Sequence, residues 1–191
     1  MRIAMKTSSQ GNPVFFVVLL ASLSACGGGD GGGSGSSQCQ FIAGGSSGVS
    51  VIVAPDCASC GVSDENRAAD GSLGSAARVV VGPIEVGHSN SGVSIRATAQ
   101  FGVVYPAGSS PTIHHSMGSG QWCNDIRTYL DGAQQEGGTG AACIGGSGTG
   151  YFAMSTSLPF DAVQVDITSN ELSDDAMVSI NEICADGEST P

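Results

Sequence analysis

Apolar and polar residues alternate along several short segments of this chain, and glycine and serine fill the gaps between them. From Val93 to Phe101 every second residue is apolar, and the segment from Val163 to Thr168 has the same pattern. Period-two alternation places the apolar side chains on one face of an extended strand. The pattern therefore predicts half-buried β-strands, and no stretch of the sequence keeps a helical period.

Turn signals separate further short apolar segments. Asp131-Gly132 predicts a tight turn, after which Ile126–Leu130 folds back as a hairpin through Ala133–Glu136. Many short strands with frequent turns predict an all-β fold, an antiparallel β-sandwich or jelly roll, over residues 38–187. About 150 residues is the size of one domain with an adequate core. The other expected strands are Val49–Val53, Arg78–Val81, Ile113–Met117 and Met177–Cys184.

The N-terminal segment has the composition of an export signal. Arg2 and Lys6 precede an apolar run, Pro13–Leu23, of about ten residues, whereas a membrane-spanning helix needs about 20. This order predicts a secretory signal peptide. The sequence Leu23-Ser-Ala-Cys26 that follows resembles the lipobox of bacterial lipoproteins. The resemblance implies removal of residues 1–25 and attachment of lipid to Cys26; an ordinary signal peptide with a chance cysteine is the alternative.

A flexible tether is expected after the lipidated cysteine. Gly27–Ser37 consists almost entirely of glycine and serine, which have little to bury and much backbone freedom. We therefore divide the chain into residues 1–25 (signal peptide), 26–37 (lipidated cysteine and tether), 38–187 (β-sandwich) and 188–191 (disordered tail). Lipoproteins retained in the inner membrane have aspartate after the cysteine. Gly27 stands there instead, so we expect an outer-membrane lipoprotein.

Six cysteines remain beyond Cys26, an even number that predicts three structural disulfides in an exported domain. Sequence alone allows 15 pairings. The spacing of Cys57 and Cys60 also occurs in thioredoxin-type redox pairs, but those need a helix that begins at the first cysteine, and Gly61 with a loop-like segment follows here. A zinc finger would need a second such pair. The six are Cys39, Cys57, Cys60, Cys123, Cys143 and Cys184.

The mature chain is strongly acidic. It contains all 17 acidic residues but only four of the six basic ones, which gives a formal charge of −13. Such a surface repels nucleic acid and anionic lipid, so we expect no nucleic-acid partner. The charge is compatible with divalent cations. The four basic residues are Arg67, Arg78, Arg96 and Arg127.

Two segments resemble discoidin-like domains, the galactose-binding-like sandwiches of the coagulation factor V/VIII C-terminal type. Asn66–Ala77 is similar to their N-x-A-x-D-G-x-x-x-T-x-W loop, although Ala77 replaces the tryptophan. The chain end is similar to their last strand, with Glu182-Ile183 at its Glu-Ile pair. The resemblance implies the same sandwich fold. The matched loop residues are Asn66, Ala68, Asp70 and Gly71, with Ser75 at the threonine position.

In many members of that family the two segments meet at a structural calcium site. By this resemblance the side chains of Asp70, Ser75 and Glu182, with backbone carbonyls of Ala68 and Ser72, would supply oxygen ligands, of which calcium needs six to eight. In an unbulged last strand the Glu182 carboxylate would point into the core, where a buried charge needs a partner. The alternative is an Asp-Gly turn beside a glutamate that a strand bulge leaves exposed.

The same resemblance suggests a disulfide pattern. The family's sandwich brings its first and last strands together, often with a bond between them, which implies Cys39–Cys184. Cys123–Cys143 would close the hairpin around Asp131-Gly132, and Cys57–Cys60 would be left as a small ring.

The sequence contains no convincing catalytic motif. Gly44–Gly48 formally fits G-x-S-x-G, but without the strand–turn–helix context of a hydrolase. His114 and His115 are expected on opposite faces of one strand. We therefore expect a non-catalytic binding or structural module on the cell surface, with carbohydrate or another surface protein as partner. The alternative is a hydrolase acting on surface polysaccharide, which would show two facing carboxylates in a polar cleft; exposed loop-tip aromatic residues would indicate binding.

Replacing Cys26 with alanine tests the lipid anchor. We expect the variant to leave the membrane fraction or to remain unprocessed, because no thiol is left to accept the lipid. Detergent phase partitioning of the parent and the variant measures this. Equal partitioning of the two proteins into detergent would contradict the lipoprotein interpretation.

Overall fold

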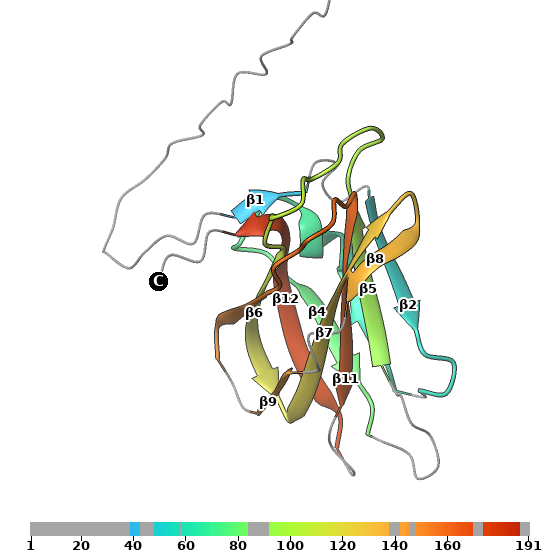
Figure 1. Ribbon diagram of the computed structural model, residues 1–191. Coiled ribbons are helices and arrows are strands. Elements are labelled where there is room, and N and C mark those ends of the chain that lie inside the picture. Colours follow the sequence, from blue (N-terminus) through green and yellow to red (C-terminus); the bar gives the residue numbers. More distant parts are fainter. Residues whose placement is uncertain are drawn as a thin grey trace, which may run out of the picture. The chain divides into compact units, whose positions relative to one another are not determined.

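The computed structural model describes a β-sandwich within residues 39–42, 48–57, 59–83, 92–137, 142–145, 148–169 and 174–187 (Figure 1). Residues 1–38, with the predicted signal peptide, Cys26 and the whole tether, and the predicted tail 188–191 lie outside the described residues. The described strands are β1 (Cys39–Phe41), β2 (Val49–Val53), β3 (Gly61–Ser63), β4 (Ala77–Val81), β5 (Gly92–Thr98), β6 (Thr112–Ser119), β7 (Gln121–Leu130), β8 (Ala133–Gly137), β9 (Ala142–Gly145), β10 (Gly150–Ala153), β11 (Ala162–Ser169) and β12 (Ala176–Gly187).

The strands form two antiparallel sheets. In the first, the order is β10-β6-β12-β4-β3, and β1 pairs with the end of β12. In the second, the order is β2-β5-β11-β7-β8, and β9 pairs with β7. A short 3₁₀ helix, η2 (Glu65–Ala69), leads from β3 toward β4. The predicted antiparallel, disulfide-bonded β-sandwich is confirmed, and among the described residues no helix is long and apolar enough to cross a membrane.

The core lies between the inner faces of the two sheets. In β5 the buried residues Val93, Ile95 and Ala97 alternate with less buried polar ones, as the sequence predicts. Two hydrogen bonds between Tyr105 and Phe160 close one end of the core, and the Phe160 ring is fully buried. Burial of each such side chain contributes about 1.5–3 kcal/mol to folding.

One turn was predicted correctly from the sequence, and another was missed. Asp131 and Gly132 both have positive φ, of 51° and 79°, and connect β7 to β8 as the predicted hairpin. The expected strand through Phe101, however, ends at Thr98. A turn from Gln100 to Val103, with Gly102 at φ 86°, leaves the Phe101 side chain fully exposed, so its prediction as a half-buried strand residue is wrong.

Three disulfides join Cys39 to Cys184, Cys57 to Cys60 and Cys123 to Cys143. These are the pairs that the family resemblance implies. The first holds β1 against β12, and the third joins β7 to β9 on the second sheet.

Removing a single disulfide should cost more stability the longer the loop that it closes, with a logarithmic dependence on loop length. The chain-entropy model gives about 5 kcal/mol for Cys39–Cys184 and about 2 kcal/mol for Cys57–Cys60, because the pairs are 145 and 3 residues apart. Denaturant unfolding of the two double alanine variants measures the difference. A larger loss for the Cys57–Cys60 variant would contradict the entropic account.

Candidate functional site

The loop after η2 is held in shape by Asp70. Its Oδ1 accepts a hydrogen bond from Ser72 N at 3.0 Å, and its Oδ2 accepts one from Ser75 Oγ at 2.6 Å. Gly71 has φ 82°, a conformation that glycine adopts without strain. The Ser72 carbonyl accepts hydrogen bonds from the N–H and the hydroxyl of Ser75. The predicted loop residues therefore form one compact turn.

Glu182 contacts this loop from β12. Its side chain is fully buried, and its Oε2 accepts hydrogen bonds from Gly71 N at 3.1 Å and from Ser72 N at 3.2 Å. Ser72 N is also bonded to Asp70, so Asp70 Oδ1 and Glu182 Oε2 lie no more than about 6.2 Å apart, the sum of the two hydrogen-bond lengths. The structure thus brings together the two predicted segments, which are more than 100 residues apart in sequence.

The last strand is bulged at Asn181, which is the strand geometry of the alternative that the sequence left open. The β12–β6 register shifts between Ile180, opposite His115, and Glu182, opposite His114. Adjacent residues of β6 face opposite sides of the sheet, so Glu182 does not share the core-facing side of Ile180. It is nevertheless buried, because the 70–75 loop covers it. Asn181, at the bulge, donates to the carbonyl oxygens of Leu73 and Ser75 and so fastens the loop to β12.

Two oxygens beside the loop lack hydrogen-bond partners. They are Glu182 Oε1 and Asn181 Oδ1, both buried. Burial raises the pKa of the Glu182 carboxyl to about 7, against the lowering effect of the N–H groups of Ser72 and Gly71; the negative charge of Asp70 adds to the rise. Buried acceptors without donors fit a cation that prefers oxygen ligands. Asp70, Ser75 and Glu182 could therefore hold calcium, with carbonyls such as those of Ala68 and Ser72.

A second candidate for a metal is ruled out by its chemistry. Among the described residues, Cys39, Cys184 and His114 place one ligand atom each within 4.8 Å of the others. Both sulfurs belong to the same disulfide, so neither is a thiolate that can bind a metal. The neighbouring His115 is buried and stacks on Phe152, with ring centroids 4.6 Å apart.

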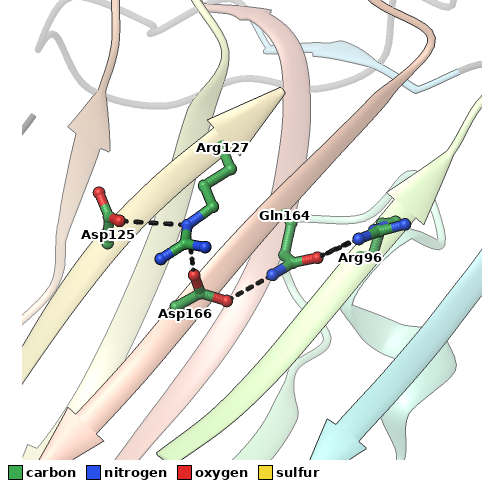
Figure 2. A network of polar contacts seen from close by, with 5 residues as sticks. All are labelled: Arg96, Asp125, Arg127, Gln164 and Asp166. Atoms are coloured by element: carbon green, nitrogen blue, oxygen red, sulfur yellow. Dashed lines mark hydrogen bonds and ion pairs between the residues drawn. The ribbon is translucent and has the colours of Figure 1, made fainter. Parts of the chain in front are cut away.

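The outer face of the second sheet carries a continuous polar network, which Figure 2 shows. Gln164 Oε1 accepts two hydrogen bonds from Arg96, and Gln164 Nε2 donates to Asp166 Oδ1 at 2.6 Å. Arg127 Nε then contacts Asp166 Oδ2 at 2.8 Å and Asp125 Oδ2 at 3.3 Å. Charged and amide groups of β5, β11 and β7 are thereby fixed side by side.

Strand register brings these residues together. One row across the sheet contains Ser50, Arg96, Gln164 and Arg127. The next row contains Ile52, Ser94, Asp166 and Asp125. Arg127 lies over Gly137 of β8, where an added Cβ would come within 2.7 Å of the Arg127 Cγ atom. The glycine thus makes room for the arginine side chain.

A hollow of about 350 Å³ opens on the same face. It is open to solvent, and the network supplies much of its polar wall. Gln164 is only 5% exposed and Asp166 is held from two sides, so the wall is rigid. The residues that line it include Ile52, Ser94, Arg127, Gln164, Asp166 and Thr168.

The sequence pattern alone does not mark this face as a site. The signal was partly present, since Arg96, Gln164 and Asp166 occupy the polar positions of the two alternating segments. Asp125 lies in the first half of β7, which was not predicted, whereas Arg127 lies in the predicted half but could not be paired with the other strands. Alternation gives the face of a residue, whereas the cross-strand neighbours depend on a register between distant segments.

The pH dependence of stability tests the environment of Glu182. Between its ordinary pKa near 4.5 and its folded-state value of about 7, the folded chain binds more protons than the unfolded chain. Without calcium, the free energy of unfolding should therefore fall as the pH rises through this window, with the full loss present above pH 7. Urea unfolding at pH 5 and pH 8, with a chelator present, measures the slope.

Glu182→Gln should remove that slope, whereas the exposed Glu65→Gln should leave it unchanged. Calcium binds the ionised carboxylate, so added calcium should stabilise the parent at pH 8 and have little effect on Glu182→Gln. An unchanged melting temperature of the parent in calcium and in chelator would contradict the metal site.

The sequence matches no protein-family model and no curated protein. Among solved structures, the chain is similar to the family 32 carbohydrate-binding module of C. perfringens NanJ, in complex with galactose; the identity is 10% and the TM-score 0.44, over 73% of this chain and 93% of that chain. It is also similar to a pectin binding carbohydrate binding module, with 11% identity and a TM-score of 0.45, over 81% and 94% of the two chains. A third similar structure is the CBM32 module of AlyQ in complex with 4,5-unsaturated mannuronic acid. Its identity is 13% and its TM-score 0.38, over 67% of this chain and 93% of that chain. At identities of 10–13% and TM-scores below 0.5, these likenesses assign neither a family nor a role to this chain.

Proposed function

We propose that this chain is a lipid-anchored, non-catalytic carbohydrate-binding module of the bacterial cell envelope, and that it binds its ligand on the outer face of the second sheet. The observation that carries the proposal is the polar network beside the 350 Å³ hollow. That volume lies at the lower end of the range of small-ligand sites, about 300–1,000 Å³.

The chemistry of the face is suited to sugar hydroxyl groups. A hydroxyl both donates and accepts hydrogen bonds, and this face offers carboxylates as acceptors beside amide and guanidinium groups as donors. Asp166 lines the hollow and supplies a carboxylate there. Because contacts among Arg96, Gln164, Asp166 and Arg127 already fix these groups, a ligand need not order them.

The arrangement of the two carboxylates favours binding over hydrolysis. Asp125 and Asp166 lie directly opposite each other on β7 and β11, and a pair of carboxylates is also what a glycosidase uses. A glycosidase needs space between its two carboxyl groups for the scissile bond. Here the Arg127 Nε atom contacts both carboxylates and occupies that position. The exposed Phe101 at the turn tip is the kind of aromatic residue that we expected of a binding module.

The anchor and the cation complete the proposal. Lipid on Cys26, followed by the eleven residues Gly27–Ser37, would tether the head with a root-mean-square reach of about 18 Å. The absence of aspartate at position 27 supports the outer membrane. Calcium at the Asp70–Glu182 loop would have a structural role, since the polar network lies on the other sheet.

Glycan binding by the mature chain with Cys26→Ser tests the function. On a glycan array we expect binding to a restricted set of sugars. Asp166→Asn should lower the affinity about tenfold or more, the effect of losing one charge-assisted hydrogen bond. The exposed Asp64→Asn should change it less than about twofold, and both variants should remain folded at the assay temperature, although Asp166→Asn loses the ion pair with Arg127. Retained affinity in Asp166→Asn would exclude this face as the site.

A further inference from the structure

We propose that the ligand carries a carboxylate, as a uronic acid does, and that Arg96 binds it. This inference rests on the proposed binding function and names the class of sugar that the same face would select. It follows from how Arg96 is held, from its charge balance and from its place beside the hollow.

The Arg96 guanidinium is held rigidly, and one of its edges remains open. Its Nε and Nη2 both donate to Gln164 Oε1, at 2.9 and 2.7 Å, which occupies the side edge. Its Cζ lies 3.6 Å from the centroid of the Tyr129 ring, so the guanidinium is fixed against that ring. The adjacent end edge, formed by Nη1 and the second hydrogen of Nη2, has no acceptor among the described residues. Two parallel N–H groups on such an edge match the two oxygens of a carboxylate.

The charges along the network are unevenly balanced. Arg127 has two carboxylates in contact with it, those of Asp125 and Asp166. Arg96 contacts a neutral amide and a tyrosine ring, and within the part of the chain that the structure describes it forms no ion pair. The mature chain has 17 acidic and only four basic residues, yet no carboxylate contacts Arg96 within the described part of the chain. An anionic ligand group would supply the missing partner.

The position of Arg96 fits an anionic group at the rim of the hollow. Arg96 lies directly across from Gln164, which lines the hollow, and two residues along β5 from Ser94, which also lines it. A sugar ring in the hollow can contact Gln164 and Asp166 through hydroxyl groups while its carboxylate points toward Arg96. Neighbouring strands such as β5 and β11 lie about 4.8 Å apart. One sugar residue can span this distance.

The acidic character of the chain sets the conditions for the test. A long polyanion would be repelled at a distance, but screening limits this repulsion to about 8 Å at physiological salt. Short ligands at 0.15 M salt therefore report the contact with Arg96 rather than the field of the whole domain. Galacturonate, glucuronate and mannuronate disaccharides are suitable probes, each compared with its carboxyl-reduced neutral form.

Titration calorimetry and amide chemical-shift mapping on the mature Cys26→Ser chain decide the question. At least one acidic disaccharide should bind about tenfold more tightly than its neutral form, with shifts on β5, β11 and β7. Arg96→Gln should remove that preference. Arg78→Gln, which changes an arginine of the first sheet that donates to Met177 Sδ, should retain it.

The outcomes separate this inference from the proposed function. Equal affinity for acidic and neutral forms on this face would overturn the carboxylate assignment and leave the binding function standing. Tighter binding of a sulfated disaccharide than of every uronate would also overturn it, in favour of a sulfate ester. No shift on this face with any probe, after a negative glycan array, would overturn both.

Discussion

The antiparallel register of β5, β11 and β7 is the constraint on which both the core and the polar face depend. In β11, Val163, Val165 and Ile167 point into the sandwich, so Gln164 and Asp166 must point out. A slip of one residue would place the polar pair in the core, at a cost of several kcal/mol. The hydrophobic core therefore fixes the position of the network without any contribution from the network itself.

This dependence explains how much could be predicted from sequence. Alternation correctly predicted β5 and β11 and the outward side of Arg96, but it could not pair them with Arg127, whose position depends on register. Short strands such as β1 and β3 carry too few residues to show a period. Phe101 was assigned to a strand because it continues the alternation; the turn at Gly102 interrupts the strand before it.

Glu182 combines one feature from each of the two alternatives that the sequence left open. An unbulged strand would have turned its carboxylate inward and a bulge would have left it exposed, whereas the structure has the bulge at Asn181 and a buried side chain. It is buried because a loop from the other end of the chain covers it, and that tertiary contact leaves no trace in local periodicity. The resemblance of two separate segments to one family indicated the contact where the strand pattern could not.

The two sheets have separate tasks. The first sheet contains the features that close the domain: the Cys39–Cys184 bond, the loop fastened by Asn181 and the buried carboxylate of Glu182. The second sheet contains the network and the hollow. Groups that are far apart and share no partner contribute nearly additively to free energy. The loop can therefore govern how stable the head is while the outer polar groups govern what it binds, and substitutions at these two places should act nearly independently.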